Sequence, residues 1–257
     1  MTDRERVARS FGQAAASYDE AAELQTAVAQ VLAKRVLAKR VLNASPAPRT
    51  ILEVGCGTGG LTRLLLPRLN GRWIVTDLSP GMVAETRRRF GDNAAEFRVM
   101  DGESPDLPPA SVDLIVSNLA AQWFGDLPKA VERLRACLAP GGRLVMTTLG
   151  ADSLAEWKQA VADAGHRAGT PPFVSRGHLA RHLPAGTVHA ETLPWTYPDA
   201  LGFLRSLKDL GASTPAQGHH PLPIPAMRQA MKSLPNPCRI TYEILTVDIK
   251  ATATPQS

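Results

Sequence analysis

The stretch that decides the fold is Ile51-Leu52-Glu53-Val54-Gly55-Cys56-Gly57-Thr58-Gly59-Gly60. The apolar run at 50–54 predicts a buried strand, and residues 59–69 predict a helix directly after it. The glycines between them let the backbone turn sharply and let a ligand approach the main chain closely. Three of them also satisfy the GxGxxG spacing of dinucleotide-binding sites. The stretch therefore predicts a nucleoside-binding loop without deciding which nucleoside is bound.

Short apolar runs alternate with helical patterns on both sides of this loop. Strands are predicted at 50–54, 72–76, 95–99, 112–117, 143–149, 187–192 and 241–249, and helices near 59–69, 80–90, 127–138 and 152–164. Pro140-Gly141-Gly142 predicts a tight turn that delivers the chain into the strand at Arg143. The alternation predicts an α/β fold, with a mainly parallel, doubly wound sheet and helices on both faces.

Two segments depart from this alternation. The first forty-odd residues have helical spacing and end at the helix-breaking run 43–48, and the stretch 194–237 contains helical patterns at 200–210 and 226–233 around a Gly/Pro/His-rich loop. We therefore expect an N-terminal helical lid (1–48), a cofactor-binding core (49–193), a substrate-selecting helical insertion (194–238), the final core strand (239–250) and a loose tail (251–257).

Acidic residues at the ends of successive strands indicate which nucleoside the loop binds. Glu53 lies beside the loop, Asp77 ends the second predicted strand and Asp101 follows the third. Ligands of open α/β sheets bind outside the carboxyl ends of the strands, so these carboxylates should converge on one crevice. They would repel the pyrophosphate of a dinucleotide and attract the sulfonium and ammonium of S-adenosylmethionine. Asp77 suits a ribose diol, and Asp101 suits an exocyclic adenine amine.

Composition narrows the class of protein less sharply. The chain has 257 residues, a formal net charge of +5 and three cysteines. The cysteines are far apart and suit neither a disulfide framework nor a metal site, so we expect buried or loop thiols in a reducing cytoplasm and no metal. No run is long enough for a membrane span or a signal peptide. The modest positive charge permits an acidic partner without selecting one.

The motifs on these strands resemble those of the class I S-adenosylmethionine-dependent methyltransferases. The loop at 53–59 is similar to their first motif, 77–82 to the second and 100–103 to the third, while 117–120 resembles the segment that passes under the ligand. The resemblance implies a seven-stranded Rossmann-like methyltransferase sheet, with a helical lid before it and a helical insertion before its last strand. The cofactor-binding residues expected from the motifs and from the closer resemblance described next are Tyr18, Glu53, Gly55, Cys56, Gly57, Gly59, Asp77, Leu78, Met82, Asp101, Gly102, Asn118 and Leu119.

A closer resemblance covers more of the chain. Residues 7–18 and 22–25, the run 117–123, and segments 147–149, 204–212 and 241–245 are similar to the malonyl-acyl-carrier-protein O-methyltransferases of biotin synthesis. This resemblance implies methylation of the free carboxylate of a malonyl thioester carried by acyl carrier protein or coenzyme A. It also implies catalytic roles for Tyr18, over the reacting methyl, and Lys208, as the cation that recognises the carboxylate. The substrate-binding residues implied are Arg205, Ser206, Lys208, Gln122 and Trp123.

Other readings stay open beside this one. Another small-molecule methyltransferase, acting on a quinone precursor or a small carboxylic acid, fits the same core, and so does a methyltransferase-like assembly or protein-modifying factor. A nucleic-acid methylase is disfavoured because Asn118 is followed by Leu119-Ala120 and not by a Pro-Pro-aromatic run. We expect a monomer that binds neither nucleic acid nor membrane. The acidic carrier gives the basic residues a use, and the candidate patches are 87–89, Arg133 with Arg135, and the cluster of Lys34, Arg35, Lys39 and Arg40.

Overall fold

A computed structural model describes residues 3–15, 18–42, 47–183, 186–210 and 220–252. Most of the predicted helix break at 43–48, much of the Gly/Pro/His-rich loop and most of the tail lie outside the described residues.

The core is one seven-stranded sheet whose strand order is β3-β2-β1-β4-β5-β7-β6. Its strands are β1 (Thr50–Val54), β2 (Arg72–Asp77), β3 (Glu96–Val99), β4 (Val112–Ser117), β5 (Leu138–Leu149), β6 (Gly186–Tyr197) and β7 (Cys238–Lys250). The first five are parallel, while β7 runs antiparallel to both β5 and β6. The predicted mainly parallel, doubly wound sheet is confirmed.

Helices cover both faces of the sheet because its central strands are buried on both sides. One face packs on α3 (Glu23–Leu42), α4 (Gly60–Leu65) and α5 (Pro80–Phe90), and the other on α6 (Leu127–Ala136) and α8 (Arg176–His182). Continuous apolar strands of this kind need cover on both faces. The start of α5 shows why these helices begin where they do: the Ser79 hydroxyl accepts from the backbone N–H of Met82, and Pro80 opens the first turn.

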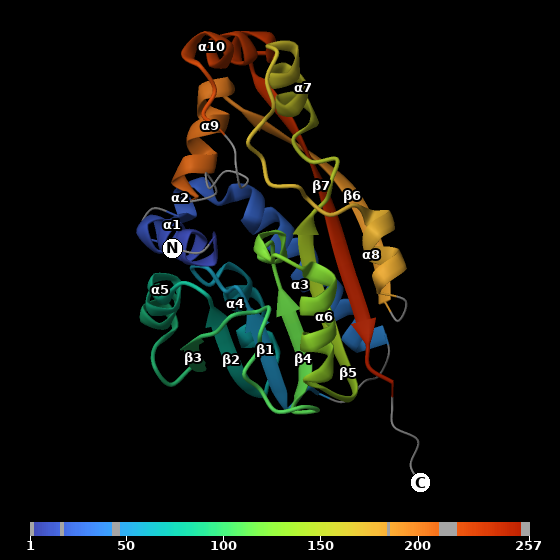
Figure 1. Cartoon of the computed structure of the whole chain (residues 1–257). Coiled ribbons are helices and arrows are strands. Elements are labelled where there is room, and N and C mark those ends of the chain that lie inside the picture. The colour runs from blue at the N-terminus through green and yellow to red at the C-terminus, as the bar shows by residue number, and fades with distance from the viewer. Residues whose placement is uncertain (1–2, 16–17, 43–46, 184–185, 211–219, 253–257) are drawn as a thin grey trace.

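The remaining helices gather beyond the carboxyl ends of the parallel strands. Figure 1 shows α1 (Asp3–Ala14), α2 (Tyr18–Ala21) and α9 (Ala200–Asp209) above those ends, with α7 (Ala155–Asp163) and α10 (Ile224–Ser233) further out. The outer layer has its own core around Phe203, Trp157 and Tyr242. The long strands β6 and β7 run from the central sheet into this layer, so they connect the two parts of the fold.

The helix α1 crosses α5 at two glycines. A Cβ atom built on Gly81 would lie 3.0 Å from the Cα of Gly12. Small residues at a helix crossing allow the backbones to approach closely, and here they hold the N-terminal segment down over the end of β2.

Three elements differ from the prediction. The span of β5 begins at Leu138, but its pairing with β4 jumps from Val112↔Leu138 to Leu114↔Arg143, so the predicted turn at 140–142 is an excursion inside the strand. Strand β6 continues to Tyr197, past the predicted strand end at residue 192. Helix α8 was not predicted at all.

Candidate active site

The loop after β1 uses its glycines in two ways. Gly55 has φ +72°, and a Cβ there would lie 2.3 Å from the Cβ of Ala120, so only glycine fits. Gly57 has φ +54° and would place a Cβ in open space, with nothing within 4 Å. The main chain therefore turns sharply at Gly55, and at Gly57 its backbone is accessible to a ligand because no side chain covers it.

Asp77 fixes this loop from the neighbouring strand. Its Oδ2 accepts from the backbone N–H of Gly57 at 2.9 Å, and its Oδ1 accepts from that of Ser79 at 2.8 Å. Desolvation raises the pKa of the Asp77 carboxyl in spite of these hydrogen bonds. One side chain thus ties the end of β2 to the glycine loop and to the start of α5.

Glu53 lies under the loop and is 1% exposed. Its Oε2 accepts from the Thr62 hydroxyl at 2.7 Å, and burial raises the pKa of its carboxyl to about 8. Asp101, after β3, accepts from the backbone N–H of Glu103 at 2.9 Å. The Glu53 carboxyl thus prefers its neutral form until a cation lies beside it.

Two adjoining cavities surround these residues and share Tyr18, Gly55, Gly57 and Asn118 as walls. Glu53 lines one of them, and Asp77 and Asp101 line the other. Every residue predicted to bind the cofactor lines at least one of the two: Tyr18, Glu53, Gly55, Cys56, Gly57, Gly59, Asp77, Leu78, Met82, Asp101, Gly102, Asn118 and Leu119. The Met82 side chain is also a core residue, and the Cys56 thiol packs in the core beside Thr86.

Asn118 joins the floor of these cavities to the N-terminal helices. Its Nδ2 donates to the backbone carbonyl of Gln25 at 3.1 Å, and its Oδ1 accepts from the Thr147 hydroxyl at 3.1 Å. The same hydroxyl accepts from the backbone N–H of Leu119, which has φ +49°. The end of β4 is therefore held in a fixed shape between α3 and β5.

Tyr18 lines three cavities that meet at the end of the sheet. It lines both cavities of the cofactor crevice and also a third, larger cavity. Desolvation, together with the Asp77 and Asp19 carboxylates, raises the pKa of its phenol, so the hydroxyl stays protonated at neutral pH. Asp19 pairs with Arg89 and accepts from Thr58, which anchors α2 to α5 and to the glycine loop.

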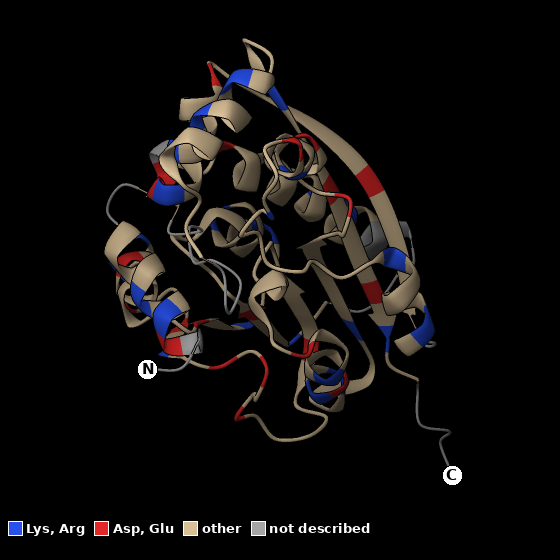
Figure 2. Ribbon diagram, turned by 45° about the horizontal axis from the view of Figure 1, so that its top comes forward, with Lys and Arg blue, Asp and Glu red and all other residues tan. Residues whose placement is uncertain are grey.

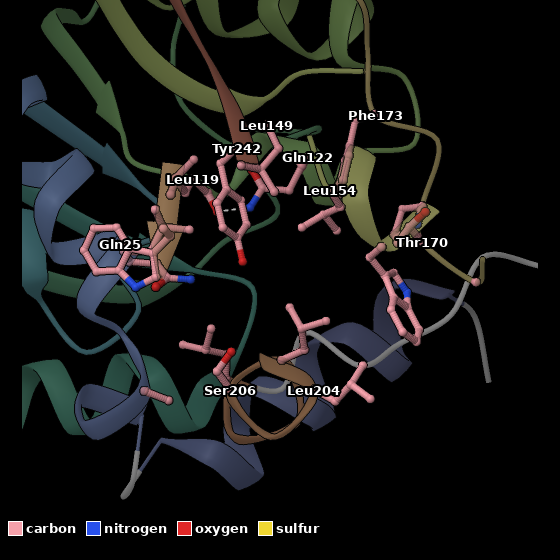
Figure 3. A pocket seen from close by; sticks show the side chains of 18 of the residues that line it. Gln25, Leu119, Gln122, Leu149, Leu154, Thr170, Phe173, Leu204, Ser206 and Tyr242 are labelled. Atoms are coloured by element: carbon pink, nitrogen blue, oxygen red, sulfur yellow. Dashed lines mark hydrogen bonds between the residues drawn. The ribbon is translucent and has the colours of Figure 1, made fainter. Parts of the chain in front are cut away.

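The third cavity has a volume of about 600 Å³ and lies between the sheet and the helical insertion (Figure 3). Eight of the thirteen aromatic residues of the chain line it: Phe11, Tyr18, Trp123, Trp157, Phe173, Trp195, Tyr197 and Tyr242. Among the described residues on its walls the one charged side chain is Glu23. Such a cavity suits an extended, mainly apolar chain with a few polar groups.

The predicted substrate-binding residues divide into two groups. Ser206, Gln122 and Trp123 line the large cavity, whereas Arg205 and Lys208 are exposed and do not. Helix α9 turns its leucines at 204 and 207 into the cavity, and Leu210 directly after the helix also lines it, which leaves the two cations on the outer side of α9. The structure therefore does not bring Lys208 to the cavity wall, and its role toward the carboxylate stays a prediction.

Several wall residues were missed by the sequence analysis, notably Trp157, Trp195, Tyr197 and Tyr242. A signal was present for two of them. Trp195 and Tyr197 alternate at a spacing of two, which places them on one face of a strand. The strand predicted from the sequence ends at residue 192, however, and therefore does not include these two aromatic residues.

The crevice fits S-adenosylmethionine. Bare backbone at Gly57 admits a ligand to the main chain, and the carboxylates of Glu53, Asp77 and Asp101 suit its ammonium, sulfonium, ribose diol and adenine amine. In the parts of the chain that are described, no group of three His, Cys, Asp or Glu residues could hold a metal ion. No described helix is both long and apolar enough to cross a membrane.

Comparisons with known proteins agree with this site. The methyltransferase-domain family matches residues 51–142. The biotin biosynthesis bifunctional protein BioCD of Bordetella avium is 40% identical over 88% of this chain, which spans only 48% of that protein. The malonyl-[acyl-carrier protein] O-methyltransferase of Magnetococcus marinus is 34% identical, with 93% of this chain and 90% of that protein covered. The YcgJ protein of Bacillus subtilis shares the fold, with a TM-score of 0.61 and 18% identity over 85% of this chain and 98% of that one.

Fold, glycine loop and carboxylate crevice together define an S-adenosylmethionine-dependent methyltransferase. The extent of the match to full-length relatives makes the class more specific. The chain belongs to the malonyl-[acyl-carrier protein] O-methyltransferase family.

Proposed function

We propose that this chain methylates the free carboxylate of a malonyl thioester on acyl carrier protein, an early step of biotin synthesis. The observation that carries the proposal is the aromatic cavity of about 600 Å³, which shares Phe11, Tyr18, Leu119 and Trp123 with the cofactor crevice. A substrate in this cavity reaches the crevice past those four side chains. Family membership supports the choice of substrate.

The reaction requires alignment of the carboxylate with the methyl group and exclusion of water more than it requires acid–base catalysis. A carboxylate is already ionised at neutral pH, and so it needs no base. When bound, S-adenosylmethionine supplies the electrophilic methyl group. The protein holds the carboxylate in line and keeps water away, and the apolar cavity walls serve both purposes.

Tyr18 is well placed to act at the meeting point of the two ligands. Its hydroxyl stays protonated because its pKa is raised, and it can therefore donate a hydrogen bond to a carboxylate oxygen. Ring contacts with Phe11, and from Phe11 to Trp123, fix the aromatic wall next to it. We assign Tyr18 to closing the lid over the reacting methyl and orienting the carboxylate.

We infer the docking side of an acidic carrier from the distribution of ion pairs on the surface. In Figure 2 basic and acidic residues are interspersed over the helices. The arginines 87–89 pair with Asp92, Glu85 and Asp19, Arg135 pairs with Glu132, and Arg35 pairs with Glu191. Arg205 and Lys208 form no ion pair with any described residue, and the opposite side of their helix lines the large cavity. We therefore place the carrier on the outer side of α9.

Replacing Lys208 by alanine is expected to raise KM for malonyl-acyl carrier protein by about fivefold, because an exposed cation that faces an acidic partner contributes roughly 1 kcal/mol. The dissociation constant of S-adenosylmethionine should change by less than twofold. The effect should shrink at high salt and be smaller with malonyl-pantetheine, which lacks the carrier. Steady-state kinetics with both substrates measure this. The control is Lys129→Ala, an exposed lysine that is paired with Asp126 on α6. Equal losses of substrate use and cofactor binding would contradict the assignment.

The direct test of the function is a methyl-transfer assay with the purified chain. We expect a methyl ester to form on malonyl-acyl carrier protein, and no product with acetyl-acyl carrier protein, which lacks the free carboxylate. Tight binding of the cofactor without methylation of the malonyl thioester would refute the proposal. That outcome would favour a different small acid, a quinone precursor or an assembly factor.

A further inference from the structure

The large cavity has no cation on its described walls. A malonyl carboxylate must nevertheless lie there if the proposed function is correct, and this inference rests on that function. A buried carboxylate requires hydrogen-bond donors to replace water. The donors must be neutral groups, namely hydroxyls, amides or indole N–H groups.

Three hydroxyl-bearing side chains from distant parts of the chain line this wall. The Tyr197 and Tyr242 hydroxyl oxygens are 2.7 Å apart and share a hydrogen bond. Ser206 on α9 donates to the backbone carbonyl of Phe203 at 2.8 Å. Figure 3 shows the Tyr242 hydroxyl pointing into the open cavity, above Ser206. All three residues line the cavity.

Each of these three hydroxyl groups has one proton to donate. Ser206 uses its proton on Phe203, and in the empty site Tyr242 can donate its proton to Tyr197. If an acceptor enters the cavity, the tyrosine pair can reverse: Tyr242 donates to the acceptor, and Tyr197 donates to Tyr242. Burial raises the pKa of both phenols, which therefore keep their protons at neutral pH.

We propose that Tyr242, supported by Tyr197, is the group that recognises the substrate's free carboxylate. One carboxylate oxygen accepts from Tyr242, and the other, which lies nearer to Tyr18, attacks the methyl group. A lysine or arginine in the same place would bind the anion more strongly and lower its reactivity. A neutral donor recognises the carboxylate without lowering its reactivity toward the methyl group to the same extent. After methylation the ester is uncharged and is a weaker acceptor, so the same contact favours release of the product.

The test is binding of malonyl-pantetheine and acetyl-pantetheine to the full chain in the presence of S-adenosylhomocysteine, by isothermal titration calorimetry. For Tyr242→Phe we expect at least about tenfold weaker binding of the malonyl compound, because a hydrogen bond to a charged group is lost. Binding of the acetyl compound and of S-adenosylmethionine should stay within twofold. Tyr197→Phe should weaken malonyl binding by about threefold, since the Tyr242 donor remains but loses its support.

The matched control is Thr246→Val, which removes a buried hydroxyl from the same strand away from the cavities described above. It should leave all three affinities unchanged. Thermal melting of each variant checks the fold, and Tyr197→Phe keeps the inference testable if Tyr242→Phe does not fold. Malonyl binding within twofold of wild type in Tyr242→Phe, or an equal loss of malonyl and acetyl binding, overturns the inference. Failure of the wild-type chain to methylate the malonyl thioester overturns the proposed function instead.

Discussion

Replacing Asp77 by asparagine is expected to weaken the binding of S-adenosylmethionine by about 100-fold or more. The Asp77 carboxylate accepts from the backbone N–H groups of Gly57 and Ser79 and lines the crevice. Asparagine has nearly the same shape but has one acceptor oxygen in place of two, and its amide N–H₂ would face a backbone N–H. The variant loses charge-assisted hydrogen bonds and the anion that attracts the cofactor. Titration calorimetry measures the affinity.

The control for this change is Asp106→Asn. Asp106 is an exposed carboxylate whose side chain pairs with Arg98, and its loss should leave the affinity within twofold of wild type. We also expect Asp77→Asn to lower Tm by a few degrees, because one N–H in the loop loses its partner. If Asp77→Asn bound the cofactor as tightly as wild type, Asp77 would have only a structural role.

Between pH 6 and 7.5 the affinity for S-adenosylmethionine is expected to rise about tenfold, and Glu53 is the cause. Burial raises the pKa of its carboxyl to about 8, so in the free protein this group is mostly protonated over that range. A cationic ligand favours the carboxylate, so a proton must leave on binding, and binding strengthens as the proton becomes easier to remove. Calorimetry in two buffers with different ionisation enthalpies should detect the released proton.

The same carboxyl makes the stability of the ligand-free protein depend on pH. The pKa of Glu53 in the fold, about 8, lies above its ordinary value of 4.5. The fold favours the neutral form of Glu53. The contribution of this carboxyl to the free energy of unfolding is therefore complete below pH 4.5 and is lost as the pH rises through 8. Glu53→Gln should therefore gain stability relative to wild type between pH 5 and 8, by a few kcal/mol, and lose the pH dependence of cofactor affinity. Thermal melts at both pH values measure the first effect. Parallel pH curves for the two proteins would contradict it.

The sheet and the cofactor crevice could be predicted from the sequence because their signals are local. Each strand of the core is short, apolar and bounded by turn residues, and each acidic group directly follows a strand. Rossmann-type topology then brings those strand ends together. Regular pairing with β4 does resume at Arg143, where the predicted strand begins, although the Pro-Gly-Gly run lies inside β5 and is not a separate turn.

The prediction failed where tertiary context overrides a local signal. The strand predicted at 187–192 stops before Pro194, yet β6 continues through this proline to Tyr197. Proline is tolerated there because β6 is the edge strand, so an N–H on its outer side has no ladder partner to lose. Helix α8 is only seven residues long, begins at the Ser175 cap and buries Leu179, which is too little for a periodic pattern.

The large cavity could not be predicted because its walls come from remote segments. Trp157, Phe173 and Tyr242 each look like an ordinary core residue in the sequence, and only the fold brings them together around an open space. Helix α9 is a different case. Its leucines at 204 and 207 and its cations at 205 and 208 occupy separate faces, a pattern that by itself indicates cations directed to solvent. The family resemblance pointed to Lys208 without saying which way it faces.

Strands β6 and β7 end and begin at directly paired residues, Tyr197 and Cys238. The chain between them therefore leaves the sheet and re-enters it at a single point. A segment attached in this way can be exchanged for another of different length without altering the path of the chain through the methyl-donor half. Specificity for the methyl acceptor can therefore change independently of cofactor binding. A chimaera joined at these two positions would transfer α9 and α10 together as one segment. Its recipient would keep Tyr242 and the rest of β7, so the transferred segment changes one wall of the acceptor cavity and leaves the other in place.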